Sequence, residues 1–155
     1  MEQAVGFVIS AEHASCAIPL DVDEHVLAGA PNDLVASHFS FDAESLTMAQ
    51  ELASALDAPL VAGSISGLVV DLNRPRMADA LAAERYGMAI GNVGLSASDR
   101  QRREAIHRAH YAAVAAEIDN GLARDGWCVL LSIHSFEPTF SPGTRLAVDL
   151  GRDVV

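Results

Sequence analysis

Three continuous apolar runs, separated by stretches with helical spacing, limit the possible folds most tightly. The runs cover residues 4–10, 68–72 and 127–133, and a shorter apolar segment lies at 60–62. An apolar run without polar alternation suits a strand that is buried on both faces. Strands that alternate with helices pair in parallel and carry helices on both sides of the sheet. The sequence therefore predicts an α/β fold with three layers (α/β/α) and a mostly parallel sheet.

Two helices are expected between these strands. The first follows Asp42, a residue type that favours the N-cap position, and its apolar residues recur at helical spacing at Leu46, Ala49, Ala53 and Leu56. The second begins at a capping box formed by Ser98 and Gln101 and ends near Gly121 or Gly126. Its buried face is expected to carry Tyr111, Val114, Ile118 and Leu122.

Length and charge narrow the class of protein. A chain of 155 residues can bury one core, so residues 1–155 are expected to form a single domain. The formal net charge of −11 repels phosphate backbones and makes nucleic acid an unsuitable partner. Cys16 and Cys128 lack metal-type spacing and indicate reduced thiols. With no signal peptide and no apolar stretch that could cross a bilayer, we expect a cytoplasmic protein without a membrane partner.

Reactive side chains follow each strong apolar run at once. Because the carboxyl ends of parallel strands share one edge, where such sheets bind ligands, we expect these side chains to lie close together. They are Glu12 and His13 after the first run, Asp71, Asn73 and Arg74 at the end of the second, and His134 and Ser135 after the third, with Arg145 a short loop later.

Each of these residues also has an ordinary structural interpretation. A single histidine beside a strand is more often hydrogen-bonded or exposed than a ligand. His13 and His134 at two neighbouring strand ends favour a metal site more strongly, because imidazole is a preferred zinc ligand. Arg74 and Arg145 fit either surface cations or carboxylate-binding groups. Asp42 could be only a helix cap, and Glu12 only a solvated acid.

At these residues the sequence resembles the N-formylglutamate amidohydrolase family. Their order and spacing match the family from near residue 7 onward, and the segments at 69–74 and 132–136 together are fairly specific. The matching stretches are Glu12-His13-Ala14 with Ile18-Pro19, residues 38–42 (HFSFD), 69–74 (VVDLNR), 90–96 (IGNVGLS), 132–136 (SIHSF), Pro138, Arg145 and 149–151 (DLG).

The resemblance implies a zinc carboxypeptidase-like fold. It also implies zinc-dependent hydrolysis of an N-formyl or N-acyl amino acid, such as N-formylglutamate, to formate and the free amino acid. His13 and His134 would bind the zinc, with Asp42 as the third ligand and Glu12 as the second choice. Glu12 and Arg74 would be catalytic, as a carboxylate base and as a cation beside the developing oxyanion. The substrate-binding residues would be Asn73, Arg74, Arg145 and Ser135.

Two departures from the family pattern affect this interpretation. Ser66 is followed by Gly67 where family members usually have an arginine, which should weaken recognition of an acidic substrate. Family members also continue well past Val155, so we expect the domain to be incomplete at its carboxyl end. An exposed sheet edge could then be covered by a second copy, which leaves a homo-oligomer open.

Two other functions compete with the zinc amidohydrolase. The first is a truncated, non-catalytic family relative that binds a small carboxylate without turning it over. The second is a serine or cysteine hydrolase that uses Ser135 or Cys16. This second alternative is weaker, because the sequence contains no GxSxG pattern and an isolated thiol usually packs as a small apolar residue.

Overall fold

The structure of the protein is a computed structural model that describes residues 6–19, 37–82, 84–85, 88–89 and 92–136. Three of its strands form one parallel sheet, and two short strands pair antiparallel elsewhere. The strands are β1 (Gly6–Ala11), β2 (Leu60–Ala62), β3 (Glu84–Arg85), β4 (Met88–Ala89) and β5 (Cys128–Ser132). The helices are α1 (Ser45–Leu56), α2 (Met77–Ala80) and α3 (Ala97–Asp125).

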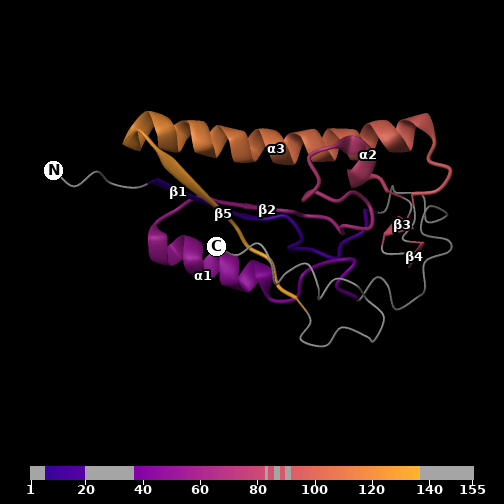
Figure 1. Cartoon of the computed structure of the whole chain (residues 1–155), viewed down its shortest axis with the longest axis horizontal. Coiled ribbons are helices and arrows are strands. Elements are labelled where there is room, and N and C mark those ends of the chain that lie inside the picture. Colours follow the sequence, from indigo (N-terminus) through magenta and orange to yellow (C-terminus); the bar gives the residue numbers. More distant parts are fainter. Residues whose placement is uncertain (1–5, 20–36, 83, 86–87, 90–91, 137–155) are drawn as a thin grey trace, which may run out of the picture.

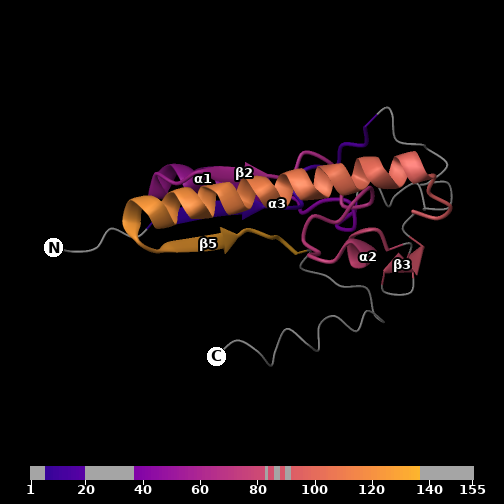
Figure 2. The same ribbon diagram turned by 90° about the horizontal axis from the view of Figure 1, so that it is seen from above.

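The parallel sheet has the order β2-β1-β5, with β1 in the middle. Figure 1 shows α3 along one side of these strands and α1 along the other, and Figure 2 shows α3 from above with β5 beside it. The prediction of an α/β fold with a mostly parallel sheet is confirmed. None of the helices in the described part of the chain is long and apolar enough to cross a membrane.

The central strand β1 supplies the core beneath the site. Val8, Ile9 and Ala11 are at most 1% exposed. Ile9 and Ala11 pack in one cluster with Ala49 and Ala53 of α1, as the helical spacing of those alanines predicted. Burial of such side chains contributes about 1.5–3 kcal/mol for each large aliphatic residue, and it fixes the strand end from which the site residues follow.

The strand predicted at residues 68–72 is wrong. This segment is a series of turns in which Leu68, Val69 and Val70 are completely buried. Its backbone groups find partners outside any sheet: the carbonyl of Leu68 accepts from the side chain of Asn92, and the amide of Asp71 donates to the carbonyl of Ala80. A buried loop can be as apolar as a strand once its backbone hydrogen bonds are satisfied in this way.

The long helix α3 begins and packs differently from the prediction. Its N-cap is Ser96, whose hydroxyl accepts from the amide of Asp99, so the start lies upstream of the predicted capping box. Gly126 ends the helix at φ 83°, a conformation that favours glycine. The predicted buried face is wrong, because Tyr111 is 37% exposed and Leu122 is 44% exposed. The buried residues of α3 are Arg103, His107, His110 and Gly121.

Candidate metal centre

His13 and His134 come together because they follow neighbouring strands. Ser10 of β1 pairs with Ser132 of β5, and each histidine lies shortly beyond this pair. Their ring centroids are 5.2 Å apart, with an interplanar angle of 66°. The parallel register therefore places the two imidazoles side by side at the carboxyl edge of the sheet, as the sequence predicted.

Asp42 completes a group of three potential ligands with these histidines. Its amide donates to the carbonyl of His13 over 2.9 Å, which anchors the loop before α1 at this edge. Its Oδ2 lies 2.7 Å from Nδ1 of His134, and its Oδ1 lies 3.6 Å from Nδ1 of His13. One ligand atom from each residue lies within 4.8 Å of the others. Two imidazole nitrogens and one carboxylate form a donor set suited to a transition metal such as zinc.

The predicted N-cap role of Asp42 is wrong. The cap of α1 is Glu44, which has φ 63° and makes no side-chain capping hydrogen bond. The carbonyl of Asp42 accepts from the amide and the hydroxyl of Ser45, at 3.2 and 2.9 Å. Its carboxylate is therefore available to the two histidines.

The far nitrogen of each histidine faces a second carboxylate. Nε2 of His13 donates to Oδ1 of Asp71 over 2.6 Å, and Nε2 of His134 lies 3.4 Å from Oε2 of Glu12. A carboxylate at this position holds a metal-binding histidine in one tautomer and one orientation. The Nδ1 atoms of both histidines face the Asp42 carboxylate. Each of these contacts needs a proton or a metal cation between the nitrogen and the oxygen, so the arrangement suits a metal site.

The ionisation of the group follows from these contacts. Burial alone would lower the pKa of His13, but its hydrogen bonds to Asp42 and Asp71, and the charges of both carboxylates, raise that pKa to about 9. Burial would raise the pKa of Asp42, but hydrogen bonds from His13 and His134 hold it well below its usual range. In the metal-free site a proton on His13 thus takes the place that a metal cation would occupy.

Glu12 is buried and is held by two serine hydroxyls. Ser10 donates to its Oε1 and Ser132 donates to its Oε2, each over 2.7 Å. Burial opposes ionisation, but these hydrogen bonds outweigh it and lower the pKa of Glu12. The side chain is therefore a fixed carboxylate at neutral pH, on the outer side of His134.

Asp71 was expected at this edge of the sheet, but the sequence assigned it no role in the centre. It is 1% exposed, and besides His13 it accepts from the amide of Asn73 over 3.0 Å. Nε of Arg74 lies 3.4 Å from its Oδ2. A buried aspartate that follows an apolar run and precedes a turn was a signal for such a role, since a buried carboxylate needs partners.

The other predicted residues lie around the group or outside the described residues. The amide of Ser135 donates to Oδ2 of Asp42 over 3.3 Å, and its hydroxyl donates to the carbonyl of Ala43. Asn73 and Arg74 are exposed on the turn after Asp71. Cys16 is exposed and has a free thiol. The position of Arg145 lies outside the described residues.

Two comparisons with known proteins found matches to this chain. The family model of N-formylglutamate amidohydrolase matches residues 5–153. The chain is also similar to the crystal structure of gene product Atu2144 from Agrobacterium tumefaciens, with 28% identity and a TM-score of 0.75. That match covers 91% of this chain and 56% of the other, so the chain spans a little over half the length of that protein. The curated proteins compared with the chain gave no match.

Proposed function

The chain belongs to the N-formylglutamate amidohydrolase family, and on this premise we propose that it is a zinc-dependent hydrolase of N-formyl and related N-acyl amino acids. His13, Asp42 and His134 bind the zinc in this proposal. The observation that carries it is the convergence of their three ligand atoms within 4.8 Å at the carboxyl edge of the sheet. Its substrates are small molecules such as N-formylglutamate, and we place the reaction in the cytoplasm.

The donor set supports zinc over the harder divalent cations. Magnesium and calcium prefer ligand sets made only of oxygen, whereas two imidazoles and one carboxylate match the ligands of catalytic zinc sites. Such a zinc ion supplies Lewis acidity, which makes water nucleophilic near neutral pH and polarises the carbonyl of an amide. Nε2 of His13 contacts Asp71, and Nε2 of His134 contacts Ser132 and Glu12. The Nδ1 atoms of both rings are left beside Asp42.

Glu12 is our candidate for proton transfer. A general base must be ionised at the working pH, and the hydrogen bonds from Ser10 and Ser132 lower the pKa of this carboxyl. The carboxylate takes a proton from the attacking water and delivers it to the nitrogen of the leaving amine. Its Oε2 lies 3.4 Å from Nε2 of His134, so the carboxylate borders the centre.

Arg74 is our candidate for stabilising negative charge. Its Nε faces Asp71, and its side chain is 46% exposed, so its remaining N–H groups can reach a ligand. A guanidinium group can stabilise the oxyanion that forms as water attacks the formyl carbon, or it can bind a substrate carboxylate. Asn73, Ser135 and Arg145 complete the proposed substrate-binding set.

The fold supports the same assignment at a coarser level. We propose that the parallel sheet, with α1 and α3 on its two sides, is a three-layer carboxypeptidase-like arrangement within one domain. The site then lies where such sheets bind ligands, beyond the carboxyl ends of the strands. A non-catalytic carboxylate-binding relative stays the alternative, because the similar crystal structure is matched over only 56% of its length.

Formate release from a panel of N-formyl amino acids, measured with zinc-loaded protein, tests the proposal. We expect turnover by the wild type and by Cys16→Ala, and loss of at least 100-fold in His134→Ala, because the metal ligand is gone. Ligand binding without formate release from any member of the panel would favour the carboxylate-binding alternative. Activity that survives in His134→Ala but not in Cys16→Ala would favour a cysteine hydrolase.

A further inference from the structure

The turn at residues 71–74 carries Arg74 next to the candidate metal centre. The amide of Arg74 donates to the carbonyl of Asp71 over 3.2 Å, and the amide of Asn73 donates to Oδ1 of Asp71 over 3.0 Å. Hydrogen bonds of this kind define a β-turn in which an aspartate side chain also accepts from the backbone. The same carboxylate accepts from Nε2 of His13 over 2.6 Å. The conformation of the turn therefore decides where Arg74 lies relative to the proposed zinc ligand His13.

The backbone of Arg74 is restrained at both of its polar groups. Its amide donates within the turn, and its carbonyl accepts from Nε2 of His107 over 2.7 Å. Pro75 follows directly, which disfavours a helical backbone at residue 74. Of these three restraints, the hydrogen bond from His107 comes from another element, because His107 lies on α3, 33 positions further along the chain. This bond ties the turn to the long helix.

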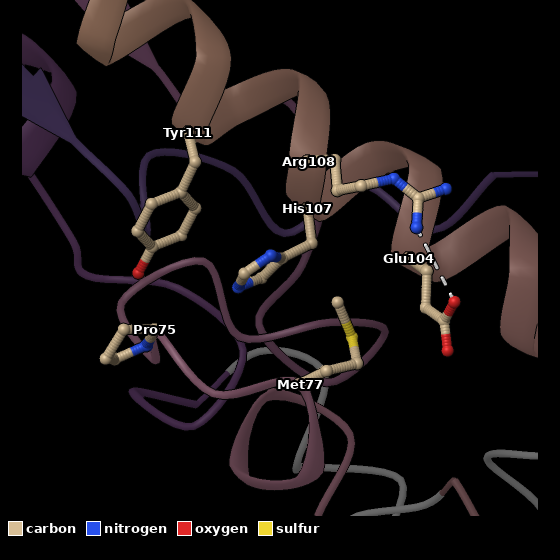
Figure 3. Close-up of a pocket in the computed structure, with 6 residues that line it drawn as sticks. All are labelled: Pro75, Met77, Glu104, His107, Arg108 and Tyr111. Carbon is tan, nitrogen blue, oxygen red and sulfur yellow. Dashed lines mark ion pairs between the residues drawn. The ribbon is translucent and has the colours of Figure 1, made fainter.

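His107 has little freedom on α3. It is 5% exposed, and its ring is stacked on that of Tyr111, one turn later, with the centroids 4.5 Å apart and an interplanar angle of 25°. Figure 3 shows both rings extending from α3 towards the loop that carries Pro75. Burial and stacking limit the rotation of the imidazole, so its Nε2 is a fixed donor for the loop.

The side chain of Arg74 depends on this backbone restraint. It is 46% exposed, and its Nε lies 3.4 Å from Oδ2 of Asp71. A half-exposed side chain is held weakly by packing, so the direction in which it leaves the main chain determines what its guanidinium group can reach. A misplacement of about 1 Å at a group that contacts the substrate can cost about 100-fold in rate. Loss of the hydrogen bond from His107 would let the end of the turn move and displace the guanidinium group.

We infer that His107 is a positioning residue for the proposed reaction: it fixes the turn that presents the Arg74 guanidinium group to the substrate at the metal centre. The inference rests on the proposed function, in which Arg74 stabilises the oxyanion or binds a substrate carboxylate. His107 acts through Arg74 and does not touch the substrate. Asp71 has an anchor of its own, because its amide donates to the carbonyl of Ala80 over 2.9 Å. The zinc ligands therefore stay in place without His107.

Two substitutions of His107 separate the hydrogen bond from the bulk of the ring. His107→Gln places an amide nitrogen as many bonds from Cβ as Nε2 of histidine, so it keeps a donor, whereas His107→Leu removes it. With N-formylglutamate and zinc-loaded protein, we expect kcat/KM to fall by about tenfold or more in His107→Leu and to stay within about threefold of the wild type in His107→Gln. The loss should fall on the same parameter, kcat or KM, as in Arg74→Ala.

Coupling to Arg74 distinguishes positioning from a general structural role. In the Arg74→Ala background, His107→Leu should lower kcat/KM by less than about twofold, because the group that it positions is gone. Ile106→Ala is the control on α3: Ile106 packs against the buried cluster that includes Val69 and Val70, so its truncation should lower the unfolding temperature and keep kcat/KM near that of the wild type. An equal loss from His107→Leu with and without the Arg74 side chain, or the same loss in Ile106→Ala, would overturn the inference.

Zinc content and backbone hydrogen exchange separate this inference from the proposed function. His107→Leu should bind zinc like the wild type, and a loss of zinc would overturn a role that runs through Arg74. If the zinc-loaded wild type releases no formate, the proposed function fails, and hydrogen exchange of the Asn73 and Arg74 amides, measured by NMR, decides the inference. Faster exchange in His107→Leu than in His107→Gln would support a turn held by His107, and equal exchange in both would overturn it.

Discussion

Nε2 of His13 donates a 2.6 Å hydrogen bond to the buried carboxylate of Asp71, which lies 58 positions further along the chain. This bond fixes the ring so that Nδ1 faces Asp42. Glu12 faces the equivalent nitrogen of His134. Both imidazoles are thus oriented from behind by a carboxylate, and the metal-binding role that we propose depends on that orientation.

Removing the charge of Asp71 should weaken metal binding without removing a ligand. In Asp71→Asn we expect the dissociation constant for zinc to rise about 10- to 100-fold, the usual effect of losing a partner that orients a ligand. Competition with a chromogenic chelator measures it. Asp79→Asn, at the exposed ion pair with Arg76, is the matched control and should bind zinc like the wild type. Equal zinc affinities in the two variants would show that Asp71 does not contribute to metal binding.

Glu12→Gln separates two roles for this carboxylate. If Glu12 is the general base, this substitution should lower kcat by about 100- to 10,000-fold. The zinc content should stay near that of the wild type. The measurement is formate release with a parallel metal determination, and Glu44→Gln at the exposed cap of α1 is the control. Loss of zinc together with activity would show instead that Glu12 acts by orienting His134.

The metal-free protein should lose stability as the pH rises through the titration of His13. Its pKa is raised from an ordinary value near 6.5 to about 9 in the folded state, so the stabilisation is fully present below pH 6.5 and disappears as the pH rises towards and beyond 9. This contribution of His13 to the free energy of unfolding is at most on the order of 3 kcal/mol. Thermal unfolding in the presence of a chelator should show this decline in the wild type, with a much smaller one in His13→Gln. Identical pH profiles would contradict the close pairing of His13 with its two aspartates.

Gly63 should be intolerant of any side chain. A Cβ at this position would overlap the carbonyl oxygen of Glu12, because the amide of Gly63 donates to the carbonyl of Ala11 at the end of β1. Gly63→Ala should lower the free energy of unfolding by about 1–3 kcal/mol and weaken zinc binding by shifting Glu12. At Gly67 a Cβ would meet its neighbours at ordinary distances of 3.5–3.6 Å, so Gly67→Ala is the matched control for denaturant unfolding. Equal stability in the two variants would show that the backbone after β1 can move to accommodate a Cβ at residue 63.

The sequence predicted the sheet edge better than the surroundings of the site. Two apolar runs formed β1 and β5 within one or two residues of the expected bounds, and polar residues after parallel strands must meet at one edge. This rule alone brought His13 and His134 together. The strand prediction for residues 68–72 was wrong because an apolar run indicates burial, not an extended backbone. In this segment turns are buried, and Asn92 and Ala80 of α2 form hydrogen bonds with their backbone groups.

The packing of α3 could not be read from its apolar residues. The helix buries Arg103 and His107 against loop carbonyls, those of Val69 and Arg74, while Tyr111 and Leu122 stay partly exposed. A polar residue can be buried wherever a neighbouring loop supplies a partner, as the carbonyl of Arg74 does for His107. Such partners come from distant segments, so periodicity along one helix does not reveal them. The role of Asp71 was missed for the same reason, because its partner His13 lies at the end of another strand.

Zinc content per chain tests the central claim most directly. Elemental analysis of the purified wild type after zinc loading and removal of free metal should give about one zinc per chain, and His134→Ala treated in the same way should give nearly none. The same zinc content in both proteins, whether near one or near zero, would contradict a metal centre built from His13, Asp42 and His134.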